Sequence, residues 1–236
     1  MHTFTVSIAG HRAQIHALFA STRDYCARYL SDGPPELTVT VTAEDLPAEQ
    51  ALLRQEALEE GLKQRNFPDP FLERSRIQRK LAEALLEKDV LLLHGSCLAL
   101  QGRAYLFTAP CGTGKSTHTR LWREAFPETV MINDDKPFLT FSGDTVTAWG
   151  APWSGKHGLD TNTCAPLKGI CLLQRGDSDE IAPMDPEALR PWLLTQCPEG
   201  AEALLDHLLA RVPLWKLTCT KHPTAAQVAH TAMFGN

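Results

Sequence analysis

The sequence has no long apolar run. The longest run near its middle, Val90 to Leu93, ends at His94, well short of the ~20 apolar residues that a membrane-spanning helix needs. The first residues do not resemble a signal peptide, because Phe4, Val6 and Ile8 alternate with polar residues. We therefore expect a cytoplasmic protein without a membrane partner.

Cysteine is present, but without the spacing of a disulfide framework or a zinc site. The seven cysteines are an odd number, dispersed along the chain, and no two of them form a CxxC pair. This pattern argues against both kinds of site. We expect most of the cysteines to be buried as small apolar residues, and Cys111 to be an ordinary loop residue.

The chain also lacks an excess of positive charge, any repeat and any low-complexity tract. With 23 Lys and Arg against 28 Asp and Glu, the net charge is -5, so there is no electrostatic reason to expect nucleic acid as a partner. The hydrophobic fraction of 43% over 236 residues suffices for a real core. The length suits one large domain or a domain with a small accessory part.

The most informative stretch is TAPCGTGKSTHTRL, from Thr108 to Leu121. It follows a strand-like apolar run at residues 104–107 and leads into helix-compatible spacing. Gly112 and Gly114 allow the backbone to curl until successive amide groups point inward, and the following helix adds the positive end of its dipole. This context predicts a Walker A-like phosphate loop (P-loop), although Ala109 stands where the strict pattern begins with glycine.

Several positions of this loop have an expected role. Lys115 would reach the terminal phosphates of a nucleotide, taken as ATP, and the Ser116 hydroxyl would bind the accompanying Mg²⁺. The residues expected to contact the nucleotide are Ala109, Pro110, Cys111, Gly112, Thr113, Gly114, Lys115, Ser116 and Thr117. The alternative interpretation is a glycine turn that merely caps a helix.

Two adjacent carboxylates, Asp134 and Asp135, follow the apolar segment Met131–Asn133. Adjacent positions on a strand point to opposite faces, so the two have different roles unless the strand has ended. One can serve the metal, and the other can accept a proton from an incoming hydroxyl. Asn-Asp-Asp alone is more typical of a turn and cap, but the phosphate loop upstream favours the catalytic interpretation.

Two further stretches are candidates. His94, in the predicted strand before the loop, is either a satisfied core residue or a functional one. The segment Gly150–Gly158, GAPWSGKHG, combines turn formers with Trp153 and Lys156. It is either a surface loop with one buried Trp or a loop that carries a cation toward phosphate and contacts the substrate.

Periodicity and turn signals predict an α/β fold of α+β character with a mixed β-sheet, preceded by a small β-α-β extension. The expected strands are residues 3–9, 37–42, 90–100, 103–108, 129–133, 137–141, 145–149, 169–174 and 214–219. The expected helices are residues 13–30, 44–64, 70–88, 186–194, 199–210 and a last one from about residue 223. Residues 1–88 are expected to form an accessory region, and residues 89–236 the phosphate-loop domain.

Together these pieces resemble the HPr kinase/phosphorylase family and its relatives, which share a phosphoenolpyruvate-carboxykinase-like nucleotide-binding fold. The shared features are the pair His94-Gly95, a hairpin into a loop ending in GKST, and the pair Asp134-Asp135. The tail Val212 to Pro223 looks like the closing strand and helix of small HPr-kinase-like proteins, which include maturation kinases of peptide natural products. The resemblance covers residues 88–232.

The resemblance implies transfer of phosphate from ATP to a serine-type hydroxyl of a peptide, protein or small molecule. Asp134 would match the general base, Asp135 an additional metal ligand, and His94 a histidine near the transferred group. Lys156 loosely matches a basic residue from a later loop. No copy of the family's second signature stretch is evident, which favours a dedicated kinase over the bifunctional enzyme; an oligomer is possible.

Two other functions are also compatible with the sequence. One is a partner protein that binds ATP and senses it without transferring phosphate. The other is a small carboxykinase-like enzyme, although the chain is short for that chemistry and has no evident cluster for a second metal and a dicarboxylate.

Overall fold

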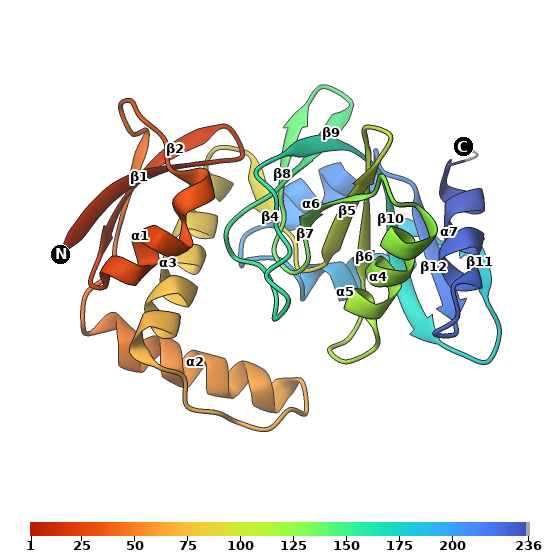
Figure 1. Ribbon diagram of the computed structural model, residues 1–236, viewed down its shortest axis with the longest axis horizontal. Helices are drawn as coiled ribbons and strands as arrows, with labels where there is room; N and C mark the ends of the chain where they lie inside the picture. Colours follow the sequence, from red (N-terminus) through yellow and green to blue (C-terminus); the bar gives the residue numbers. More distant parts are fainter. Residues whose placement is uncertain (235–236) are drawn as a thin grey trace. The chain divides into compact units, whose positions relative to one another are not determined.

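The computed structural model describes residues 1–234 (Figure 1). The chain divides into two compact units, of which unit 1 comprises Met1–Lys88 and unit 2 begins at Asp89. Each unit has its own sheet and helices, so each is described by itself.

Unit 1 contains a three-stranded sheet in the order β1-β2-β3, in which β1 and β2 are antiparallel and β2 and β3 are parallel. Its elements are β1 (His2–Ile8), β2 (His11–Ala17), α1 (Ala20–Tyr25), a short 3-10 helix (Ala27–Tyr29), β3 (Leu37–Thr40), α2 (Asp45–Glu59) and α3 (Asp69–Leu86). The strands at residues 3–9 and 37–42 and the helices at 44–64 and 70–88 were therefore predicted correctly in type.

The helix predicted at residues 13–30 is wrong in its first part, whereas its second part contains α1 and the short 3-10 helix. Most of its first part belongs to β2, where Ala13, Ile15 and Ala17 are buried with the two-residue period of a strand. Ala9 and Gly10 both have positive φ, 51° and 85°, and this two-residue turn folds β2 back onto β1. Unit 1 therefore opens as β-β-α-β and not as β-α-β.

Unit 2 is a mixed α/β structure around a nine-stranded sheet. Its elements are β4 (Val90–Leu92), β5 (Ser96–Leu100), β6 (Arg103–Thr108), α4 (Lys115–Ala125), β7 (Val130–Asn133), β8 (Phe138–Ser142), β9 (Thr145–Trp149), β10 (Cys164–Arg175), β11 (Glu180–Pro183), α5 (Pro186–Leu194), α6 (Glu202–Leu209), β12 (Leu214–Cys219) and α7 (Thr224–Phe234). The strand order is β4-β8-β9-β10-β6-β5-β7, with β12 also paired to β10 and β11 to β12.

The long strand β10 joins the two parts of this sheet. Its first residues, 164–166, pair antiparallel with β9, whereas residues 167–172 run parallel to β6 and residues 170–175 run parallel to β12. The sheet is therefore mixed, as predicted. Its parallel strands β6 and β10 end side by side, with Thr108 opposite Leu172.

Helices cover both faces of the sheet around β6. Helices α4 and α7 pack beside each other on one face (Figure 1). Phe107 and Tyr105 point to that face, in a buried cluster that includes Trp122. Thr108 points to the other face, because successive strand residues alternate, and its hydroxyl accepts a hydrogen bond from Trp192 of α5. Side chains therefore pack against β6 on both faces of the sheet.

The strand predicted at residues 90–100 is interrupted, so His94-Gly95 lies between β4 and β5 and not within a strand. β4 pairs with β8, whereas β5 forms the predicted hairpin with β6 and also pairs with β7. A Cβ on Gly95 would lie 2.7 Å from Leu106 Cδ2 and 3.0 Å from the Phe107 carbonyl oxygen, so the chain crosses β6 too closely for a side chain. β11 was not predicted.

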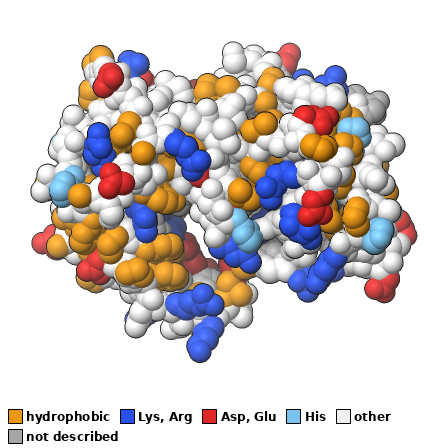
Figure 2. Space-filling model, viewed as in Figure 1, with side chains coloured by type: hydrophobic (Ala, Val, Ile, Leu, Met, Phe, Trp, Pro, Cys, Tyr) orange, Lys and Arg blue, Asp and Glu red, His pale blue; other side chains and the backbone are white. Residues whose placement is uncertain are grey.

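In residues 1–234, no helix is both long enough and apolar enough to cross a membrane. On the face of the molecule drawn in Figure 2, Lys and Arg side chains are interspersed with Asp and Glu side chains.

Candidate functional site

Three connections of unit 2 meet at one end of the sheet. Ser96 lies opposite Phe107 in the β5–β6 pair, and Cys97 lies opposite Asn133 in the β5–β7 pair. The residues before β5, after β6 and after β7 therefore emerge at the same edge. This register brings together His94, the glycine loop that starts at Ala109, and the pair Asp134-Asp135.

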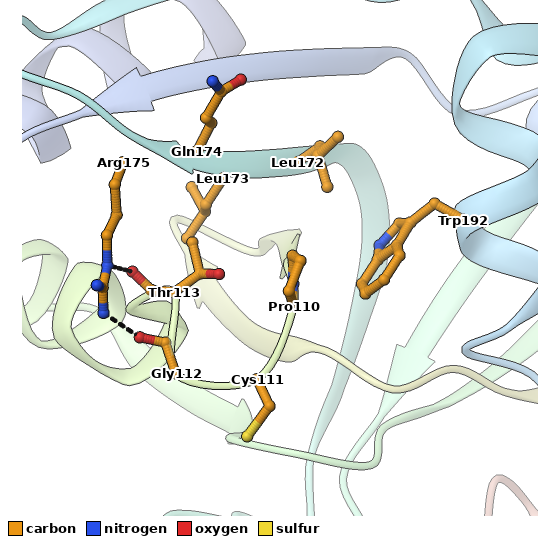
Figure 3. Close-up of a pocket in the computed structure, with 9 residues that line it drawn as sticks. All are labelled: Pro110, Cys111, Gly112, Thr113, Leu172, Leu173, Gln174, Arg175 and Trp192. Carbon is orange, nitrogen blue, oxygen red and sulfur yellow. Dashed lines mark hydrogen bonds between the residues drawn. The ribbon is translucent and has the colours of Figure 1, made fainter. Parts of the chain in front are cut away.

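The glycine loop connects β6 to α4 and is held in a curled conformation. Gly112 and Gly114 have φ of 75° and 127°, values that favour glycine, and Gly114 is the N-cap of α4. Arg175, at the end of β10, donates from Nε to the carbonyl oxygen of Thr113 at 3.1 Å and from its guanidinium to that of Gly112 (Figure 3). The predicted strand-loop-helix arrangement is therefore present. We call the two hydrogen bonds from Arg175 to the loop carbonyls the arginine brace.

The brace orients the peptide groups of the loop. In a trans peptide the N–H points opposite to the C=O. Because the carbonyl group of Thr113 points to Arg175, the N–H of Gly114 points away from Arg175. First-turn amides of a helix have no intrahelical acceptors, and the helix dipole is positive there. The geometry is suited to an anion.

Lys115 extends back over the loop from the first position of α4. Its Nζ donates to the carbonyl oxygen of Ala109 at 2.8 Å. Its charge also contributes to lowering the pKa of both His94 and Asp135. Lys115 therefore lies near both of these residues as well as the loop, while Ser116 and Thr117 follow it half-buried in the same turn.

His94 and Asp135 form a pair, with 3.2 Å between His94 Nε2 and Asp135 Oδ1. Burial lowers the pKa of His94, and the nearby charge of Lys136 adds to this, although the hydrogen bond with Asp135 acts in the opposite direction. Burial alone would raise the pKa of Asp135, but His94 and Lys136 outweigh it and lower the pKa, so this carboxylate is ionised.

Asp134 has a different environment. Its side chain is buried, and Oδ1 accepts a 2.6 Å hydrogen bond from the N–H of Gly155. The second oxygen, Oδ2, is buried and has no hydrogen-bond partner within residues 1–234. Burial raises the pKa of Asp134, although the Gly155 N–H acts in the opposite direction, and the charge of Asp135 raises it further. The two adjacent carboxylates thus differ in basicity.

Asn133 connects the carboxylate pair to the segment Gly150–Gly158. Its Oδ1 accepts hydrogen bonds from the N–H groups of Asp135 and Lys136, at 2.8 and 2.6 Å. Its Nδ2 donates to the carbonyl oxygens of Ala151 and Trp153, at 2.8 and 3.2 Å. Asn133 is completely buried, so this side chain joins two connections inside the protein.

The segment Gly150–Gly158 places its backbone, more than its charged side chains, at the site. Trp153 is buried, which agrees with the simpler of the two sequence interpretations for that residue. Lys156 follows Gly155 and is exposed. The structure therefore groups His94, Lys115, Asp134 and Asp135, and leaves Lys156 at the rim.

Sequence reasoning missed Asn133, the Gly155 amide, Lys136 and Arg175. Asn133 had a usable signal, because an Asn that starts an Asn-Asp-Asp turn often bonds the backbone two residues on. No local pattern indicated Arg175, because it is far from the loop in the sequence. The parallel pairing of β6 with β10 brings the two together.

Comparison with models of known protein families gives no match, and no curated protein matches this sequence. Among solved structures, the HPr(Ser) kinase/phosphatase from Coxiella burnetii matches with a TM-score of 0.39 and 8% identity, over 61% of this chain and 97% of that one. The resemblance seen in the motifs is thus accompanied by a distant structural neighbour and by no family model.

Proposed function

We propose that this chain is a phosphotransferase that moves the γ-phosphoryl group of ATP to a hydroxyl of a peptide, protein or small molecule. The observation that carries the proposal is the meeting of the glycine loop, the His94–Asp135 pair and buried Asp134 at one end of the sheet. Phosphoryl transfer requires mainly positioning and charge neutralisation, and these groups supply both.

The loop would hold the phosphates. Backbone N–H groups at the start of α4 would face the phosphates, with the positive end of the helix dipole behind them. Lys115, which bonds to the carbonyl oxygen of Ala109 in this structure, would turn its ammonium group to the β- and γ-phosphates. The hydrogen bonds from Arg175 would hold the loop in its curled conformation, so the loop would not need to reorder when the nucleotide binds.

Ser116 and Asp135 would hold Mg²⁺. They offer a hydroxyl and an ionised carboxylate, the hard oxygen donors that Mg²⁺ prefers. Within residues 1–234 there is no group of three or more His, Cys, Asp or Glu that could hold a metal by itself. This donor set fits an ion that shares its ligands with phosphate oxygens and water. When bound, the ion would neutralise charge on the transferred group.

Asp134 would act as the base. As the acceptor oxygen bonds to the γ-phosphorus, the bond from that phosphorus to the β–γ bridging oxygen breaks, and ADP leaves with the electron pair. The hydroxyl proton passes to Asp134 Oδ2, the buried oxygen without a partner in residues 1–234. A carboxylate whose pKa is raised by burial is a better base than an exposed one. His94 and Lys136 would border the transferred group.

The test is phosphate transfer from γ-labelled ATP to a degenerate peptide library with one serine per peptide, and to water. Wild-type protein is expected to release ADP and to label an acceptor. Asp134→Asn, which keeps the shape of the side chain, should reduce transfer by about 100-fold or more while leaving ATP affinity nearly unchanged. The exposed Asp177→Asn provides the control in the same unit.

Two results would contradict parts of this proposal. Transfer by Asp134→Asn at the wild-type rate would remove Asp134 as the base. Tight ATP binding by the wild type, without transfer to water or to any acceptor in a set of peptides, proteins and hydroxyl-bearing small molecules, would favour the non-catalytic ATP-binding protein instead.

A further inference from the structure

A cavity of about 640 Å³ adjoins the glycine loop on the side of β10 (Figure 3). One wall is the loop itself, from Pro110 to Thr113, and another is the end of β10 with Leu172 and Leu173. Trp192 of α5 closes a third side. The volume lies within the range of small-molecule sites, and the loop that forms one wall is the segment that would bind phosphate.

The indole of Trp192 is held in place at this cavity. Its Nε1 donates to Thr108 Oγ1 at 3.1 Å, and Thr108 is the last residue of β6 before the loop. The ring reaches from α5 to the side of Pro110, with Leu172 nearby on β10 (Figure 3). Trp192 is half-buried, so part of its aromatic surface remains available to a flat ligand.

The order of the strands decides which part of a nucleotide would lie here. In the sequence β10-β6-β5-β7, the loop follows β6, the cavity lies toward β10, and Asp134 follows β7 on the other side. A nucleotide whose γ-phosphate faces Asp134 and His94 therefore extends in the opposite direction toward β10. An acceptor hydroxyl must instead reach the γ-phosphate near Asp134, so the cavity beside β10 does not suit the acceptor.

We propose that this cavity binds the nucleoside part of the nucleotide, with the base against Trp192 and the apolar side chains of Pro110 and Leu172. The inference rests on the proposed function, because it takes the loop as the phosphate site. It adds residues of β10 and α5 to the binding site, and it assigns to Trp192 the discrimination between a nucleotide and a bare polyphosphate.

The test compares the affinities of the full chain for ATP and for inorganic tripolyphosphate, both with Mg²⁺. Wild-type protein is expected to bind ATP more tightly than tripolyphosphate. Trp192→Ala should weaken ATP binding about tenfold or more, the size expected for loss of base stacking, and leave tripolyphosphate binding nearly unchanged. Leu172→Trp, which fills the cavity, should have the same selective effect without removing Trp192.

Trp149 provides a matched control. It is also half-buried, and its Nε1 likewise donates to a threonine hydroxyl, Thr140 Oγ1, at 2.8 Å, but it does not line the cavity. Trp149→Ala should leave the ratio of the ATP and tripolyphosphate affinities at the wild-type value. A change in that ratio as large as for Trp192→Ala would overturn the inference.

The remaining outcomes separate the two proposals. If the wild type binds tripolyphosphate as tightly as ATP, or if both cavity variants retain the wild-type affinity for ATP, the nucleoside site is wrong and the phosphate loop stands. If the wild type binds neither compound, the phosphate loop is wrong, and the nucleoside site falls with it.

Discussion

The side-chain amide of Asn133 donates a hydrogen bond of 2.8 Å to the backbone carbonyl of Ala151. Through its oxygen the same side chain accepts from the N–H of Asp135, so it links the carboxylate turn to the segment that delivers the Gly155 amide. Asp134 also accepts a hydrogen bond from the Gly155 N–H, between the same two connections. Two neighbouring buried side chains, Asn133 and Asp134, thus join the two connections.

Replacing Asn133 with Ala should lower the free energy of unfolding of unit 2 by about 3 kcal/mol, because buried backbone groups on both connections lose their partner. Urea denaturation measures this. Asn133→Asp keeps the acceptor for Asp135 and Lys136 but loses the donor to Ala151 and Trp153. This variant should be destabilised as well. A stability equal to that of the wild type would show that the hydrogen bonds to Ala151 and Trp153 do not stabilise the fold.

Gly150 has no room for a side chain. A Cβ at this position would lie 1.9 Å from the carbonyl oxygen of Thr161 and 2.9 Å from that of Ile132. Gly150→Ala should therefore cost about 3 kcal/mol or more through backbone displacement. Gly102→Ala, in an open turn with φ of 74°, should cost only about 1–2 kcal/mol. Equal losses in thermal or urea unfolding of the two variants would contradict the steric explanation.

Arg175 should affect phosphate binding although, within residues 1–234, its side chain donates only to loop carbonyl oxygens. Arg175→Ala removes both hydrogen bonds to the loop, so the loop must become ordered when phosphate binds. This ordering costs free energy, and the affinity for tripolyphosphate should fall about tenfold. Arg211 is a matched control, because it also donates to a loop carbonyl, that of Gly143, away from the site. Calorimetry should find phosphate affinity unchanged in Arg211→Ala; an equal loss there would exclude a specific role for Arg175.

Acid should lower the free energy of unfolding of unit 1, because it protonates the Asp45 carboxylate. Asp45 lies 2.8 Å from Lys80 Nζ and 3.1 Å from Arg76 Nε. Burial would raise the pKa of its carboxyl, but the hydrogen bonds from Lys80, the Thr42 amide and Arg76 outweigh burial and hold the pKa well below its ordinary value. The ionised form is favoured in the folded state, so this stabilisation is present above the unfolded pKa, about 3.9, and is lost as pH falls below it.

The variant Asp45→Asn isolates this contribution. At pH 7 it should be less stable than wild type by about 2 kcal/mol, and the difference should shrink when both are measured below pH ~3. Denaturant unfolding at several pH values, followed by a probe in unit 1, gives the difference directly. A gap that stays constant between neutral and acid pH would show that the Asp45 charge does not stabilise the fold.

Much of the local structure followed from the sequence because it depends on nearby residues. Turn chemistry at Gln101-Gly102 and alternation on either side were enough for the β5–β6 hairpin, in which both turn residues have positive φ. The first part of the helix predicted at residues 13–30 was wrong because composition there does not exclude a helix, and β2 is selected by pairing with β1 and β3.

For the glycine loop, the sequence by itself determined the residues that curl the backbone and the charge that follows them, since Gly112, Gly114 and Lys115 act within one short segment. Only the tertiary structure decided what surrounds that loop. Strand register brings His94 and Asp134 to the same edge, and the parallel pairing of β6 with β10 supplies Arg175 and the cavity beside Trp192. These are contacts between residues far apart in the chain, and no local pattern specifies which strands become neighbours.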